Sequence, residues 1–190
     1  IEGADKDGVS VRLADDKTDY SAKVVGADRQ TDVAVLKIEA KGLKPITLGD
    51  SDQLEVGDVV LTVGNPFGLV QSVTMGIVSA IGRDSGGRIL GREGYEDFIQ
   101  TDAPINVGNS GGALINTNGE LIGINTAVLA KNLGVEGIGF AIPVNLVRGV
   151  MSEILQKGRV VRGWIGIVPV DVDAVEARRN NLARPGVVIQ

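Results

Sequence analysis

Residues 107–127 read "VGNSGGALINTNGELIGINTA", and this stretch decides which fold the sequence predicts. Two apolar runs, residues 112–116 and 120–128, flank the pair Asn118-Gly119, which is typical of a tight β-hairpin turn. Similar Val- and Ile-rich runs recur along the chain at residues 9–13, 21–26, 32–38, 58–64, 71–82 and 136–143. Short strands separated by turn residues at regular intervals predict an all-β protein, either an antiparallel sandwich or a barrel.

One segment has the period of a helix instead. Its apolar residues recur at i, i+3 and i+4, and Gly158 is placed to end the helix. These residues are Leu146, Val147, Val150, Met151, Ile154 and Leu155. The character of the chain changes after this helix, and we predict two domains, residues 1–158 and 159–190. The second segment is too short to bury a core by itself.

Composition excludes several classes of function. The net charge of -5 argues against a nucleic-acid partner. The 190 residues include no cysteine and no histidine, so disulfides and thiolate metal sites are excluded, and a zinc site would need carboxylates alone. We therefore expect no cofactor and no metal. No apolar run approaches the length of a transmembrane helix.

Ser110 lies in the sequence Gly108-Asn109-Ser110-Gly111-Gly112, which matches the pattern G-x-S-x-G. In an α/β-hydrolase a helix follows that serine directly, whereas here a glycine pair and a strand follow, so this interpretation fails. In a β-barrel protease the N–H groups of Gly108 and Ser110 would bind an oxyanion, and glycine suits the required backbone conformation. Asn109 has no predicted chemical role. Taken alone, the pentapeptide is also consistent with an ordinary turn.

The longer stretch "QTDAPINVGNSGGALINTNGELIGINTA", residues 100–127, resembles the active-site segment of the HtrA/Deg family of serine proteases. Four further stretches agree in order: "GADRQTDVAVLKI", "LEVGDVVLTVGNPFGL", "TMGIVSAIGR" and "GIGFAIPVNLV". The resemblance extends from residue 1 to about residue 170. It implies a chymotrypsin-like double β-barrel with an incomplete N-terminal barrel, one C-terminal helix and the start of a PDZ domain.

The resemblance also implies roles for individual residues. Ser110 would be the nucleophile, and Asp32 would be the aspartate that orients the catalytic histidine. Gly108 and Ser110 would supply the oxyanion N–H groups. Ile105 and Val128 would line a specificity pocket that favours small aliphatic residues before the cleaved bond. From the residues alone, Asp32 is a strand-edge acid, and the two apolar residues are equally consistent with barrel core.

The chain lacks the base that such a serine needs. In the family the histidine lies in a segment of the type "TNxHVIxGAD", and this chain opens with "IEGAD", which places that histidine two residues before Ile1. We interpret the sequence as part of an active enzyme, and we expect the 190 residues alone to be inactive. Two alternatives stay open: a catalytically dead peptide-binding or scaffold relative, and a structural fragment without activity or partner.

The segment "RGWIGI", residues 162–167, resembles the start of a PDZ domain, in which Trp164, Ile165, Gly166 and Ile167 would form the loop that binds a peptide carboxylate. The family resemblance implies misfolded or regulatory protein substrates, activating C-terminal peptides bound by a full PDZ domain, a homotrimer, and a periplasmic location with an inner-membrane anchor outside this chain. Four loops around the site are expected to rearrange on activation: residues 64–72, 82–97, 103–108 and 127–136.

Overall fold

A computed structural model describes residues 8–14, 18–65, 71–91, 93–106, 108–128, 137–163, 166–167 and 169–189. The chain divides into two compact units, Ile1–Val160 and Val161–Gln190. In the described part of the chain, no helix is long and apolar enough to cross a membrane. The same residues contain no group of three or more acidic, cysteine or histidine side chains that could hold a metal ion.

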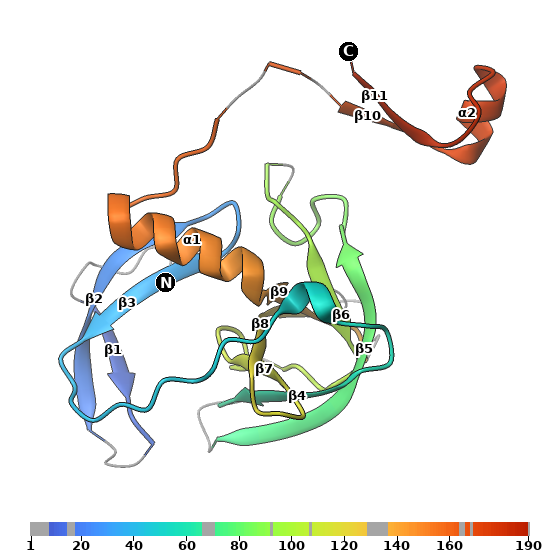
Figure 1. The fold of residues 1–190 in the computed structure, drawn as a ribbon. Helices are drawn as coiled ribbons and strands as arrows, with labels where there is room; N and C mark the ends of the chain where they lie inside the picture. The colour runs from blue at the N-terminus through green and yellow to red at the C-terminus, as the bar shows by residue number, and fades with distance from the viewer. Residues whose placement is uncertain are drawn as a thin grey trace. The chain divides into compact units, whose positions relative to one another are not determined.

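The first unit contains two antiparallel β-structures (Figure 1). A three-stranded sheet has the order β1 (Val9–Arg12), β2 (Asp19–Asp28), β3 (Val33–Ile38). A closed barrel follows, in the order β4-β5-β6-β9-β8-β7. Its strands are β4 (Val59–Gly64), β5 (Ser72–Arg83), β6 (Phe98–Thr101), β7 (Ala113–Asn116), β8 (Leu121–Val128) and β9 (Gly139–Pro143). The predicted all-β class is confirmed.

The predicted hairpin at residues 117–119 is also confirmed, because β7 pairs with β8 across it. Gly119 has a φ of +77°, a conformation that glycine adopts without steric cost. The Gly119 N–H donates to the Asn116 carbonyl over 3.0 Å, and the Asn116 N–H donates to the Glu120 carbonyl over 3.0 Å. β8 therefore runs from this turn back past the serine loop, which gives the candidate site one of its walls.

Helix α1 (Val144–Lys157) joins the three-stranded sheet to the barrel, with contacts to β2 and β3 on one side and to β8 and β9 on the other. Val150 and Ile154 are buried in the cluster that also contains Val33, Phe98, Phe140 and Ile142. The helix ends at Gly158, whose φ is +73°, as predicted. Leu155, in contrast, was expected on the apolar face but is 60% exposed.

The packing between sheet and helix is close at Gly26 of β2. A Cβ atom built there would lie 2.7 Å from both the carbonyl oxygen of Gly158 and Cγ2 of Ile154. A separate apolar cluster fills the barrel, and its members are Leu54, Val60, Val78, Ile99, Leu114, Ile122 and Ala141. The cluster that contains Val33, Val150 and Ile154 fixes the sheet against the barrel, and hence the turn before β3 against the loop before β7.

The second unit is small. β10 (Pro169–Val172) pairs antiparallel with β11 (Gly186–Ile189), and α2 (Ala174–Arg179) lies between them in the chain. Asp173 caps α2 by accepting hydrogen bonds from the N–H groups of Val175 and Glu176 at 2.7 and 2.8 Å. The polar stretch after residue 173 therefore forms a short capped helix.

Candidate active site

Ser110 lies in the loop that leads into β7. Gly108 and Gly111 on either side have φ values of +99° and +82°, conformations that L side chains rarely adopt. The Gly111 N–H donates to the Asn125 carbonyl at 2.7 Å, and the Asn125 N–H donates to the Gly112 carbonyl at 2.9 Å. This exchange of hydrogen bonds fastens the serine loop to β8 and leaves the Ser110 side chain exposed.

The Ser110 hydroxyl donates to the backbone carbonyl of Thr126 in β8, with Oγ and O separated by 2.8 Å. The side chain of the same threonine faces the other predicted catalytic residue. Thr126 Oγ1 donates to Asp32 Oδ2 at 2.7 Å, although the two residues are 94 positions apart in the sequence. Ser110 and Asp32 therefore meet at one residue. No sequence signal distinguishes Thr126, which fits an ordinary strand pattern.

Asp32 lies in the turn between β2 and β3 and has a φ of +57°. A left-handed conformation is uncommon for a residue other than glycine, and such residues cluster at functional sites. The buried Thr31 supports the turn by donating to Asp28 Oδ2 at 2.6 Å. The turn therefore holds the Asp32 carboxylate toward β8, although residues other than glycine usually avoid this positive φ.

The two predicted pocket residues flank the same glycine. Ile105 is buried, and a Cβ atom built at Gly139 would lie 2.7 Å from Ile105 Cδ1. Val128 pairs with Gly139 across β8 and β9. Its side chain lies outside the described residues. The Ile105 side chain therefore fills the space that a side chain at Gly139 would take.

The predicted carboxylate loop is described only in part. Trp164 and Ile165 lie outside the described residues. Gly166 has a φ of +68°, and Ile167 is exposed.

Loop 84–90, within the predicted regulatory segment 82–97, is organised by one carboxylate. Glu96 Oε1 accepts the N–H of Leu90 at 2.9 Å, and Glu96 Oε2 accepts the N–H of Ser85 at 2.6 Å and its hydroxyl at 2.5 Å. Burial raises the pKa of Glu96, but these hydrogen bonds outweigh burial and lower the pKa from its usual 4.5 to about 2. The base of the loop is held near Asp32, since the Tyr95 N–H donates to the Gln30 carbonyl at 2.7 Å.

We predict that Glu96→Gln loosens this loop. Trypsin should cut after the exposed Arg88 about tenfold faster at neutral pH, because the loss of charge-assisted hydrogen bonds favours local opening. Glu93→Gln is the matched control and should cut at the wild-type rate. Since the folded pKa of Glu96 is lowered, its stabilising effect is complete above about pH 4.5 and is lost as pH falls toward about 2. Equal trypsin rates in both variants would contradict the assignment.

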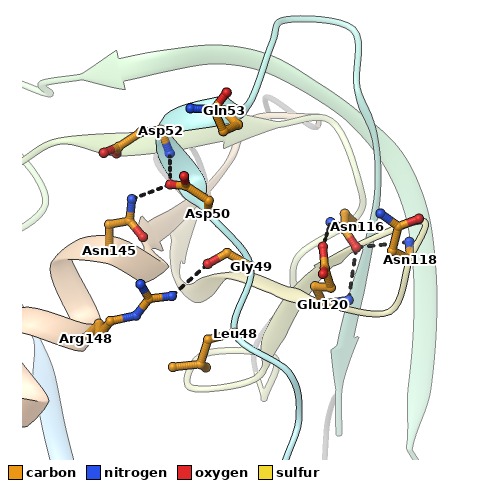
Figure 2. A pocket seen from close by; sticks show the side chains of 10 residues that line it. All are labelled: Leu48, Gly49, Asp50, Asp52, Gln53, Asn116, Asn118, Glu120, Asn145 and Arg148. Atoms are coloured by element: carbon orange, nitrogen blue, oxygen red, sulfur yellow. Dashed lines mark hydrogen bonds between the residues drawn. The ribbon is translucent and has the colours of Figure 1, made fainter.

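A polar hollow of about 750 Å³ lies at the opposite end of β8 (Figure 2). Asn145 Nδ2 donates to Asp50 Oδ1 at 2.7 Å, and the Arg148 guanidinium donates to the Gly49 carbonyl at 2.8 Å. The hydrogen bond from Asn145, with one from the N–H of Asp52, lowers the pKa of Asp50. These contacts join α1 to the short 3₁₀ helix η1 (Ser51–Gln53). The hollow contains neither Ser110 nor Asp32.

Comparisons with known proteins point to one family of peptidases. The family described as "Trypsin-like peptidase domain" matches residues 2–124. The chain is 52% identical over 171 residues to the periplasmic serine endoprotease DegP of Salmonella typhimurium, covering 90% of this chain and 35% of that protein. It is 50% identical over 175 residues to the periplasmic pH-dependent serine endoprotease DegQ of Escherichia coli K12, covering 92% of this chain and 37% of that protein. The chain thus spans little more than a third of the length of these relatives.

Solved structures give the same result. The HtrA-type protease AlgW with a tripeptide superimposes with a TM-score of 0.83 at 50% identity, covering 95% of this chain and 58% of that one. The serine endoprotease from Yersinia pestis superimposes with a TM-score of 0.68 at 48% identity, covering 82% of this chain and 52% of that one.

Proposed function

The chain belongs to the trypsin-like peptidase family and to its HtrA/Deg members, and from this premise we propose that it carries the nucleophile and the orienting acid of a serine endopeptidase. One observation carries the proposal: the Ser110 hydroxyl and the Asp32 carboxylate both hydrogen-bond to Thr126. Asp32 comes from the three-stranded sheet and Ser110 from the barrel, and their meeting at Thr126 is expected if both belong to one active site.

The proposed reaction is peptide-bond hydrolysis through an acyl-enzyme. Ser110 Oγ attacks the carbonyl carbon, a histidine takes the hydroxyl proton, and Asp32 orients and stabilises the charged histidine. The N–H groups of Gly108 and Ser110 hold the oxyanion, and the histidine then returns the proton to the leaving amine. Water hydrolyses the acyl-enzyme in the second half. The described chain contains no histidine, and we propose that the base lies two residues before Ile1.

We propose that cleavage follows small aliphatic residues, which is supported by the buried aliphatic side chain of Ile105, packed against Gly139 of β9. The test uses a chain carrying the histidine-bearing segment before Ile1 and peptides that differ only at the residue before the cleaved bond. Peptides with Val or Ala should react at least about tenfold faster, in kcat/KM, than the peptide with Phe, since a filled apolar pocket excludes a larger side chain. Equal values for Val and Phe would contradict the pocket assignment.

The alternative function is a catalytically dead module that only binds peptides. The same experiment separates the two functions. A dead module would show no hydrolysis with the segment added, and it would still bind unfolded protein.

We further propose that misfolded or regulatory proteins are the substrates and that the protein acts in the periplasm, with an inner-membrane anchor outside this chain. The relatives named above are periplasmic endoproteases, which supports this location.

We place the protease domain at residues 1–158 and the start of a PDZ domain at 159–190. The separation into compact units at Val160 supports the boundary. The full PDZ domain would bind activating C-terminal peptides.

A homotrimer is the proposed assembly. The outward face of β4 and β5 supports it, because Val59 lies directly opposite Ile77 across the two strands, with Met75 and Val73 further along β5. All four are exposed apolar side chains. A contiguous apolar stripe on a strand pair is typical of a protein–protein interface, and a second copy of this chain is the occupant that the family resemblance implies.

A further inference from the structure

The segment that leads to Gly108 is attached to β5 by side chains instead of a backbone ladder. The hydrogen-bonded pairing of β5 with β6 reaches Val78 and Thr101. Beyond that point the Ile77 N–H donates to Asp102 Oδ1 at 2.8 Å, and the Thr74 hydroxyl donates to the Pro104 carbonyl at 2.8 Å. Because proline has no N–H, a ladder could not continue here. The Thr74 hydroxyl supplies the missing connection.

Thr74 is itself held by a second threonine. Thr62 lies directly opposite it across β4 and β5, and the two hydroxyl oxygens are 2.6 Å apart. Each hydroxyl has one proton. The Thr74 hydroxyl lies 2.8 Å from the Pro104 carbonyl oxygen and the Thr62 hydroxyl 3.5 Å from it, so the shorter contact assigns the Thr74 proton to Pro104 and leaves Thr62 as the donor to Thr74. Two hydrogen bonds therefore run in series from β4 to the start of the 104–109 segment.

Thr62 is a polar residue in the apolar barrel interior, as are the buried Thr101 and Asn125. Thr62 is fully buried, and the neighbouring inward residues, Val60, Val78 and Leu114, are apolar. Burying a hydroxyl costs free energy unless it is hydrogen-bonded. A buried polar side chain with satisfied hydrogen bonds, at a position where the pattern calls for an apolar residue, is expected at a functional site. Here the departure coincides with the end of the barrel that carries the serine loop.

The other end of the segment returns to the same carbonyl. Asn109 is 3% exposed, and its Nδ2 lies 3.5 Å from the Pro104 carbonyl oxygen. Asn109 Oδ1 is buried without a hydrogen-bond partner among the described residues. It lies against Gly64, where a Cβ atom would overlap it. Thr74 and Asn109 thus both contact the Pro104 carbonyl, and the residues between Pro104 and Asn109 include the proposed oxyanion donor, Gly108.

We propose that Thr74, supported by Thr62, is a positioning residue for the proposed hydrolysis. By fixing the Pro104 carbonyl it fixes where the 104–109 segment starts, and so where the N–H groups of Gly108 and Ser110 lie. Thr74 touches no reacting atom. The proposal rests on the proposed function, because without catalysis the position of these N–H groups has no consequence for a substrate.

The first test needs no catalysis. Amide hydrogen exchange of Asn109, Gly111 and Gly112, whose N–H groups are hydrogen-bonded, is compared in the 190-residue chain between wild type, Thr74→Val and Thr74→Ser. Thr74→Val keeps the shape of the side chain and removes the hydroxyl, so exchange should be about tenfold faster. Thr74→Ser keeps the hydroxyl and should restore the wild-type rates. Thr117→Val, in the exposed β7–β8 turn, is the matched control.

The second test uses the histidine-bearing chain. Thr74→Val should lower kcat about tenfold and leave KM within about twofold, because oxyanion donors act in the transition state and not in substrate binding. Thr74→Ser should recover kcat. If Thr74→Val does not fold, Thr62→Val applies the same test from β4 and should change both readouts in the same direction.

Three results would overturn the proposal: unchanged exchange in Thr74→Val, equally accelerated exchange of the β9 amides, or a rise in KM with kcat unchanged. Acceleration throughout the barrel would mean general stability instead of positioning. If the wild-type histidine-bearing chain hydrolyses no peptide, the proposed function fails, and the catalytic part of this inference fails with it. The exchange experiment would then still decide whether Thr74 holds the segment.

Discussion

Adding a histidine-bearing segment before Ile1 is expected to raise peptide hydrolysis by about 10⁶-fold over the 190-residue chain. In the structure the Ser110 hydroxyl donates to the Thr126 carbonyl, which can orient the hydroxyl but cannot accept its proton during attack. A serine hydroxyl without a base is a weak nucleophile at neutral pH. The measurement is kcat for a peptide with Val before the cleaved bond, at saturating substrate.

Two single variants of the extended chain are the controls. Ser110→Ala and replacement of the added histidine by Ala should each abolish the gain, and the double variant should be no slower than either, because the members of a triad act as a unit. Activity that survives Ser110→Ala would show that another group performs the hydrolysis. Activity of the unextended chain at a comparable rate would show that no histidine is needed. Either result would contradict the assignment.

The fold was largely predictable because its signals are local. Val- and Ile-rich runs between turn residues predicted the strands, the Asn118-Gly119 pair predicted the β7–β8 turn, and helical spacing ending at Gly158 predicted α1. Closure of the barrel through the pairing of β4 with β7 could not be predicted from a local pattern, since it joins segments about 50 residues apart in sequence. The exposure of Leu155 was missed for a related reason. Helical period predicts which residues form the apolar face of α1. Which of them are buried depends on how far the sheet and the barrel extend along the helix, and Leu155 lies beyond that contact.

The site was predictable only where backbone conformation limits the choice of residue. Glycines around Ser110 marked a loop with left-handed positions, which the structure contains at Gly108 and Gly111. Thr126 and Thr74 left no such mark, because threonine is an ordinary strand residue and its role here depends on partners far along the chain. Asn109, between a glycine and the serine, also had no predicted role. Its burial follows from the close approach of Gly64, which is a tertiary contact.

Asp32→Asn is expected to lower kcat of the extended enzyme by about 10⁴-fold, with little change in KM. The carboxylate accepts the Thr126 hydroxyl at 2.7 Å and would face the added histidine with its remaining lone pairs. An amide can accept from Thr126, but it cannot stabilise a charged imidazole and would favour the wrong tautomer. Asparagine tolerates the left-handed φ of +57° at this position, so the turn should keep its conformation.

The matched control is Asp52→Asn, the same chemical change in the polar hollow at the other end of β8, which should leave kcat within about twofold. Thermal unfolding of both variants separates catalysis from folding, since loss of activity at an unchanged Tm can only come from the site. Thr126→Val supplies an intermediate case. It removes the hydroxyl that holds the Asp32 carboxylate and keeps the charge, so its effect on kcat should be smaller than that of Asp32→Asn. If Asp32→Asn retained more than about a tenth of wild-type kcat, Asp32 would be a turn residue that the fold happens to place beside Thr126, and the acid that orients the base would have to lie elsewhere.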